Sequence, residues 1–260
     1  LEVLELQNTK VTGSGFRYLS GLKKLERFHL SHVDIDAIDD INEVKCLSSL
    51  LLNVDSPAPD GHAPETNDIV IADQPTITEL SITLQRPVES VRIVNCPALK
   101  NVFLHLTEDI PQVRFDGCPQ MEIITFDQDR NTMKSGENRI GKLQFSKCDS
   151  LIYVNLLQVY AASVECDNDL LQLKGSRINA CVSTAWLRFL AERCPAINHM
   201  EVYIRHLDGN PQELDNLPPM KNLTRFHFSG DTADENSVLK LLEGAENLTD
   251  IEIRGTDVSA

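Results

Sequence analysis

The chain repeats one pattern of apolar positions: an apolar residue, two other residues, a second apolar residue, one other residue and a third apolar residue. Most copies recur every 22 to 30 positions, which predicts a solenoid with one short strand in each coil. The clear copies begin at Leu1, Leu25, Leu47, Ile77, Leu99, Met121, Leu151, Ile197, Leu223 and Leu248. Because the interval from Leu151 to Ile197 is twice a normal period, we expect an eleventh, degraded copy near Leu171 and Leu173.

Helical segments are expected near both ends of the chain. Apolar residues three positions apart at 12–24 and 34–46 predict short helical turns on the outside of the solenoid. Towards the C-terminus, Thr184 and Asp234 are helix-capping residues, and each precedes an amphipathic segment. These segments predict helices at 184–194 and 235–244.

The middle of the chain follows a different pattern. Upstream of three cysteines, apolar and polar residues alternate, which predicts a second strand in each coil in place of a helix. The alternating segments cover residues 91–93, 113–115 and 143–145. Three further segments are polar or rich in proline and interrupt the repeat, so we interpret them as loop insertions. They cover residues 54–68, 127–142 and 207–219.

The length and the run of repeats together predict one domain. With 260 residues, 42% of them hydrophobic, the chain is long enough for a substantial core. We expect a single elongated solenoid of ten or eleven repeats over residues 1–260. Solenoids usually end in atypical capping repeats, whereas ordinary copies begin at Leu1 and stop shortly before Ala260. We therefore expect a fragment of a longer protein.

The charge and the hydropathy of the chain exclude two classes of partner. The formal net charge is -15, whereas proteins that grip nucleic-acid backbones rely on clustered lysine and arginine. We therefore expect no nucleic-acid partner. No segment approaches the roughly 18 consecutive apolar residues that a membrane-spanning helix needs. We therefore expect no membrane insertion.

Four of the seven cysteines occupy one position of the repeat, three residues before the first apolar residue of a copy. They are Cys96, Cys118, Cys148 and Cys194. Other copies have Leu22, Val44 or Met220 there, so we expect buried free thiols; a disulfide ladder between coils is the alternative. No cysteine or histidine spacing typical of a metal site occurs, and we expect neither a metal nor a cofactor. Free thiols favour an intracellular location.

The repeats resemble a known family. The strand pattern, the Thr-x-Val turn at 9–11 and 256–258, and the sequence FLAERCPAI at 189–197 resemble leucine-rich repeats. The segment 189–197 is similar to the cysteine-containing repeats of ubiquitin-ligase substrate receptors, and the segment 4–12 is similar to tandem repeats of environmental bacteria. The irregular central repeats resemble the bacterial surface-antigen type. This resemblance covers most of the chain and implies fold rather than function.

The fold that the resemblance implies is an α/β leucine-rich-repeat solenoid, with a parallel sheet on the concave side and mixed helices and strands on the convex side. No F-box-like segment is present, so the resemblance implies no role in ubiquitin transfer. If the apolar template residues point into the core, the residues that alternate with them point out onto the concave face.

A candidate binding site lies in the middle of this concave face. Four apolar residues are expected close together there, within a ring of polar residues, as in a protein-binding hot spot. The apolar members are Phe103, Ile123, Tyr153 and Leu157. The surrounding residues are Asn101, His105, Asn155, His199 and Tyr203. The alternative is that a loop or a neighbouring domain covers these residues.

The sequence therefore predicts a non-catalytic scaffold that binds another protein, of unknown identity, on its concave face. No G-x-S-x-G, phosphate-binding glycine-rich loop or H-E-x-x-H motif occurs, so we expect no catalytic residues and no enzyme activity. One alternative is a parallel β-helix carbohydrate-active enzyme, in which Glu5, Asp127, Glu201 and Glu252 would be sugar-site carboxylates. The other is a purely structural spacer.

Overall fold

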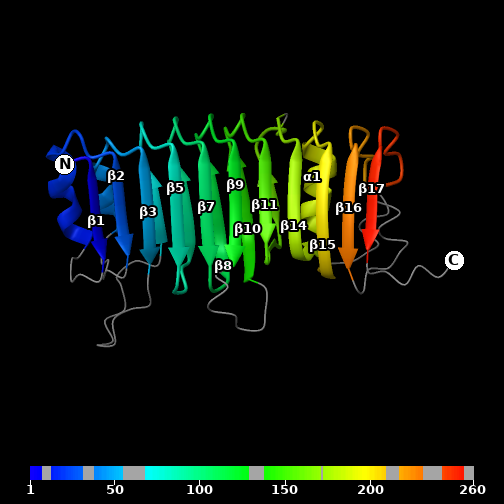
Figure 1. Cartoon of the computed structure of the whole chain (residues 1–260), viewed down its shortest axis with the longest axis horizontal. Coiled ribbons are helices and arrows are strands. Elements are labelled where there is room, and N and C mark those ends of the chain that lie inside the picture. Colours follow the sequence, from blue (N-terminus) through cyan, green and yellow to red (C-terminus); the bar gives the residue numbers. More distant parts are fainter. Residues whose placement is uncertain are drawn as a thin grey trace.

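The computed structural model describes residues 1–7, 13–31, 38–54, 68–128, 138–170, 172–208, 217–230 and 242–254. Eleven parallel strands form the first sheet, in the order β1-β2-β3-β5-β7-β9-β11-β14-β15-β16-β17, and stand side by side along the molecule (Figure 1). Their bounds are β1 Val3–Gln7, β2 Arg27–Ser31, β3 Ser49–Val54, β5 Glu79–Leu84, β7 Asn101–Leu106, β9 Ile123–Gln128, β11 Tyr153–Leu157, β14 Gly175–Ser183, β15 His199–Asp208, β16 Arg225–Gly230 and β17 Asp250–Arg254.

A second parallel sheet lies behind the central part of the first. Its strand order is β12-β10-β8-β6-β4, and the short strand β13 also pairs with β10. The bounds are β4 Asp68–Ala72, β6 Ser90–Val94, β8 Ile110–Asp116, β10 Asn138–Ser146, β12 Val159–Ala161 and β13 Val164–Cys166. The second strands predicted at 91–93, 113–115 and 143–145 are confirmed as parts of β6, β8 and β10.

The chain is a β-solenoid, and the prediction of an α/β leucine-rich-repeat solenoid with a mixed helix and strand convex side is wrong. Strands make up 49% of the described residues and helices 12%. The helical segments are η1 Gly13–Gly21, η2 Ile38–Glu43 and α1 Thr184–Arg193. The physical reason is the period-two alternation of the central coils, which buries one face of a strand and gives a helix no continuous apolar stripe.

The apolar template residues form the core of the solenoid, as predicted. From the copy at Leu25 to the copy at Leu223, each template residue is at most 2% exposed. Neighbouring strands keep these residues in register, so that Leu80 pairs with Val102 and Val102 with Ile124. In the first and last copies Leu1, Ile251 and Ile253 are exposed.

The degraded eleventh copy is confirmed as the strand β14. Its three template positions hold Leu173, Ser176 and Ile178, all fully buried. A serine at the middle position hides the pattern in the sequence. The indole Nε1 of Trp186 donates a hydrogen bond to the Ser176 hydroxyl at 3.2 Å, so the buried oxygen has a polar partner. Leu171 lies outside the described residues.

One of the two predicted C-terminal helices is confirmed. Helix α1 begins at Thr184, but the capping residue is Ser183, whose hydroxyl accepts a hydrogen bond from the Trp186 backbone at 3.1 Å. The helix predicted at 235–244 lies almost wholly outside the described residues. The turns predicted at 12–24 and 34–46 contain the 3-10 helices η1 and η2.

The predicted loop insertions are shorter than their stated bounds. Strand β9 continues to Gln128 and β10 begins at Asn138, so both ends of the segment 127–142 are strand. Val54 and Asp68 belong to β3 and β4, and β15 continues to Asp208. The central parts of these insertions lie outside the described residues.

The four cysteines of the shared repeat position are buried and free, which confirms the first interpretation and not the disulfide ladder. The thiols of Cys96, Cys118 and Cys148 lie near backbone carbonyls. Cys148 Sγ, for example, donates to the carbonyl of Ser146 at 3.3 Å. These thiols therefore serve as small apolar side chains with weak internal hydrogen bonds.

Candidate protein-binding face

On the first sheet, the positions that alternate with the core residues form three rows across the strands. We call this surface the open face. Its middle row consists of the residues between the second and third template residues of each copy, and the register adds Arg177 on β14, which the sequence pattern had missed. The middle row is Glu5, His29, Leu51, Ser81, Phe103, Thr125, Asn155, Arg177, Glu201, His227 and Glu252.

The predicted apolar residues lie on three neighbouring strands of the open face, β7, β9 and β11, and we call them the apolar patch. Phe103 and Ile123 are 39% and 37% exposed, which is high for large apolar side chains in a sheet. Ile123 pairs directly with Tyr153, and Phe103 is the diagonal neighbour of Ile123. Leu157 lies four residues beyond Tyr153, at the other end of the same strand, where it pairs with Asp127 and is half-buried. The structure therefore brings Phe103, Ile123 and Tyr153 together as predicted, whereas Leu157 lies apart from Ile123 and Tyr153.

Tyr153 leans away from the patch, towards β14. A Cβ atom on Gly175 would lie 2.2 Å from Tyr153 Cε2, so the ring occupies the space that a side chain at Gly175 would need. Burial raises the pKa of the Tyr153 hydroxyl above its ordinary value, and the Glu201 carboxylate adds to the rise. Tyr153 therefore connects the apolar patch to the charged strands beyond Gly175.

The predicted polar ring is split between two environments. Asn101 pairs with Ile123, His105 pairs with Asp127, and Asn155 donates from Nδ2 to the Thr125 hydroxyl at 3.0 Å. These residues border the apolar patch directly. The two other predicted members, His199 and Tyr203, lie on β15 and are separated from the patch by β14. His199 belongs to a separate group of charged residues, and Tyr203 lies beside that group.

The open face carries very little charge in its middle. Five neighbouring strands, β3, β5, β7, β9 and β11, contribute fifteen positions to the three rows. Only Glu79 and Asp127 among these positions are charged at neutral pH, and none is lysine or arginine. We call these fifteen positions the central band. Charged residues make up 24% of the whole chain, so the central band is poor in charge by comparison.

Beyond the central band, strands β14 to β17 carry a group of charged side chains that we call the charged network. Its members are Arg177, His199, Glu201, Arg225, His227, Asp250, Glu252 and Arg254. Of these residues, the sequence pattern predicted His199 as a binding residue, and Glu201 and Glu252 only as carboxylates of the enzyme alternative. Arg177 was missed because Ser176 breaks the apolar template of its strand.

Glu201 is the acidic side chain that Arg177 and His199 share in the first half of the network. Its two carboxylate oxygens lie 3.2 Å from Arg177 Nε and 3.2 Å from His199 Nε2. The Arg177 guanidinium also lies over the ring of Tyr203, 5.6 Å from its centroid. The side chain of Glu201 is 21% exposed, so these contacts are partly shielded from water.

In the second half of the network one histidine lies between two carboxylates. His227 Nε2 is 3.5 Å from Asp250 and His227 Nδ1 is 3.8 Å from Glu252. Arg225 Nε lies 4.0 Å from the same oxygen of Asp250, and Arg254 Nε donates to Glu252 at 2.6 Å. Each carboxylate of the network therefore faces one arginine and one histidine.

The carboxylates proposed for the enzyme alternative do not pair. Glu5, Asp127, Glu201 and Glu252 lie on β1, β9, β15 and β17, and no two of these strands are neighbours in the sheet. Glycoside hydrolysis usually needs two carboxyl groups on either side of one bond. Among the described residues, no three histidine, cysteine or acidic side chains are placed to hold a metal ion.

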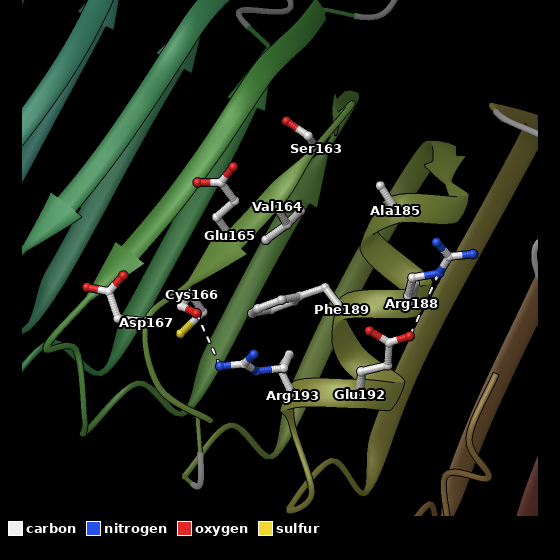
Figure 2. A pocket seen from close by; sticks show the side chains of 10 residues that line it. All are labelled: Ser163, Val164, Glu165, Cys166, Asp167, Ala185, Arg188, Phe189, Glu192 and Arg193. Carbon is white, nitrogen blue, oxygen red and sulfur yellow. Dashed lines mark hydrogen bonds and ion pairs between the residues drawn. The ribbon is translucent and has the colours of Figure 1, made fainter.

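A groove on the other side of the molecule lies between β13 and α1, with a volume of about 530 Å³ (Figure 2). The buried ring of Phe189 points from the helix towards β13, and Arg193 closes one end. Arg193 donates to the Cys166 carbonyl at 3.1 Å and contacts Asp169 at 2.8 Å, while Arg188 and Glu192 pair at 3.9 Å. These contacts seal the edge of the second sheet, and they leave the open face as the better candidate.

No protein-family model and no curated protein matches the chain. The resemblance to the leucine-rich-repeat family therefore stays a prediction. Within the described part of the chain, none of the helices is both long and apolar enough to cross a membrane.

Proposed function

We propose that this protein binds another protein through the open face, with the apolar patch at the centre of the contact. The observation that carries the proposal is the central band, where only two of fifteen outward positions are charged in a strongly acidic chain. The centres of protein interfaces are depleted in charged residues and enriched in aromatic ones, whereas their rims are polar. Phe103 and Ile123 supply the exposed apolar anchors of such a centre.

The β-solenoid supports this role because it holds the anchors in place. Each residue of the patch lies on a strand that is hydrogen-bonded on both sides within the eleven-stranded sheet. A rigid surface loses little conformational freedom when a partner binds, so more of the contact energy remains as affinity. The function requires side-chain display and no chemistry, in keeping with the expectation of a non-catalytic module.

The test begins with the whole chain as bait and with identification of the captured protein. Binding of that purified partner is then measured by calorimetry for the parent chain and for the double variant Phe103→Ala/Ile123→Ala. We expect the double variant to lose about 30-fold or more in affinity, since central hot-spot residues contribute about 2 kcal/mol or more. Both side chains are exposed, so the thermal unfolding midpoint should change little.

The matched control is Tyr18→Ala. Tyr18 is an aromatic residue of η1 that is 77% exposed and does not belong to the open face. This variant should bind the partner as the parent chain does. Equal affinity of the parent chain and the Phe103→Ala/Ile123→Ala variant would rule out the open face as the binding surface.

A further inference from the structure

The histidines of this chain are concentrated on the open face. Four of the seven have described side chains, and all four point out from the first sheet. They are His29, His105, His199 and His227. Histidine is the side chain whose ordinary charge change falls between about pH 5 and pH 8. The four described histidines therefore lie on the same face as the apolar patch.

Two of these histidines lie inside the charged network, and their rings are 6.2 Å apart. Arg177, Arg225 and Arg254 contribute three positive charges, and Glu201, Asp250 and Glu252 contribute three negative charges. The network is therefore balanced only while both imidazoles are neutral. When both carry a proton, the network has a net charge of +2.

The balance matters because histidines and arginines share the same carboxylates. Glu201 faces both Arg177 and His199, at 3.2 Å each. A single carboxylate that faces both a guanidinium and an imidazolium neutralises only one of them. Protonation therefore leaves donors of the network without a full counter-charge on this face. The same relation holds at the carboxylates around His227.

We propose that the charged network is a pH-dependent subsite for acidic groups of a protein partner, closed at neutral pH and open at mildly acidic pH. This inference rests on the proposed role of the open face in partner binding. An acidic partner fits because charge-assisted bonds from guanidinium and imidazolium to carboxylate are the strong ones, and the freed donors need such an acceptor. Arg177 of the subsite lies on β14, next to β11 at the edge of the central band, so one partner reaches both.

No lysine stands at the described outward positions of β14 to β17, around the two histidines. The charged and titratable side chains on the open face around His199 are Tyr153, Arg177, Glu201, Tyr203, Arg225 and His227. Those around His227 are His199, Glu201, Tyr203, Arg225, Asp250, Glu252 and Arg254. The ordinary pKa of a tyrosine side chain, near 10, lies well above this pH range.

The experiment uses the whole chain and a defined probe, a rhodamine-labelled deca-aspartate peptide, followed by fluorescence anisotropy in about 50 mM salt. Aspartate has an ordinary pKa near 3.9, so the probe keeps most of its charge at both pH 5.5 and pH 7.5. We expect affinity to be at least tenfold higher at pH 5.5 than at pH 7.5. A labelled deca-serine peptide should not bind at either pH.

The double variant His199→Gln/His227→Gln tests whether the network is responsible. Glutamine keeps a polar amide but cannot gain a proton, so the affinity ratio should fall to about one, with circular dichroism to confirm the fold. His29→Gln changes a histidine of the same face outside the network and should keep the ratio. Absence of probe binding at pH 5.5, or an unchanged ratio in the double variant, would overturn the inference.

The Phe103→Ala/Ile123→Ala variant separates this inference from the proposed function. Its apolar patch is removed while the charged network is intact, so the ratio for the aspartate probe should stay near that of the parent chain. If the ratio is present but the partner binds the variant unchanged, the proposed function fails and the subsite survives. If the probe binds equally at both pH values but the variant loses affinity for the partner, the subsite fails and the proposed function survives.

Discussion

The ring of Tyr153 occupies the space above Gly175 on the neighbouring strand of the first sheet. A Cβ atom at Gly175 would lie 2.2 Å from Tyr153 Cε2 and 2.4 Å from Tyr153 Cδ2. Glycine within a strand often marks such a close approach by a neighbouring group, and an aromatic ring that covers it replaces the packing that glycine lacks. The pair thereby joins the apolar patch to the charged network.

We predict that Gly175→Ala destabilises the chain by about 1–3 kcal/mol, because the added methyl group forces the Tyr153 ring out of its position. Urea unfolding measures the change in unfolding free energy. The control is Gly15→Ala, where a Cβ atom would meet no heavy atom within 4 Å and where little change is expected.

A double-mutant cycle assigns this cost to the contact itself. In a Tyr153→Ala background the ring is absent, so Gly175→Ala should cost much less than it costs in the parent chain. An equal cost in both backgrounds would mean that the glycine is required for another reason, such as the backbone of β14.

Ser176→Ala should destabilise the chain by about 1–3 kcal/mol, because it leaves the buried indole Nε1 of Trp186 without its partner. Trp186 is the single tryptophan, so its fluorescence follows unfolding directly. Ser48→Ala is the control, since the Ser48 hydroxyl donates to the Glu26 carbonyl at an exposed position. If the two variants cost the same, the buried hydrogen bond to Trp186 contributes no special stability.

Ser176 also marks the strand of the first sheet that the apolar template did not locate clearly. The template of three apolar residues located ten strands of the first sheet, because a strand with one buried face must alternate. At β14 the middle template residue is Ser176, and only its bond to Trp186, ten residues away, makes burial acceptable. A pattern of apolar positions cannot show this compensation, so Arg177 was missed with its strand.

Local sequence patterns do not decide whether the second layer of the solenoid consists of helices or of strands. Alternation at 91–93 and 113–115 predicted the strands that the structure shows as β6 and β8. No strand was predicted at Asp68–Ala72, where the structure has β4. Strand β4 pairs with β6, and a local sequence pattern does not contain this pairing between separate segments. The neighbourhood of Phe103, Ile123 and Tyr153 was predictable because it follows from strand register alone, whereas the pairing of arginines and histidines on shared carboxylates depends on side-chain rotamers.

Asn42 caps the exposed edge of β4, and its removal should loosen that edge. Its Nδ2 donates to the carbonyl of Val70 at 2.9 Å, and its Oδ1 accepts from the backbone N–H of Ala72 at 2.7 Å. The side-chain amide thus pairs with β4 as the peptide group of another strand would. We predict that Asn42→Ala speeds hydrogen exchange at the Ala72 amide and costs about 1–3 kcal/mol.

Asn42→Asp provides the comparison for this edge. Aspartate keeps an oxygen for Ala72 but has no donor for Val70, so exchange at the Ala72 amide should stay closer to that of the parent chain. Equal exchange rates at this amide in the parent chain and in Asn42→Ala would show that the side chain does not protect the edge.

The buried thiol of Cys148 should make the unfolding free energy depend on pH in the alkaline range. Burial raises the pKa of its thiol from 9.0 to about 12. Between these values the unfolded chain has lost this proton while the folded chain keeps it, so the unfolding free energy falls as the pH rises. One such thiol contributes a fall of up to about 1.4 kcal/mol for each pH unit.

Cys148→Ala should therefore unfold more easily at pH 8, since it leaves a cavity, yet lose stability less steeply than the parent chain between pH 9 and pH 11. Urea unfolding with a non-thiol reductant measures both quantities. Val44→Ala is the matched control, because Val44 is fully buried at the same position of its own repeat and has no proton to lose. It should lower stability at every pH and leave the alkaline slope as it is in the parent chain. The same slope in Cys148→Ala and Val44→Ala would show that the Cys148 thiol does not stay protonated in the folded chain over this range.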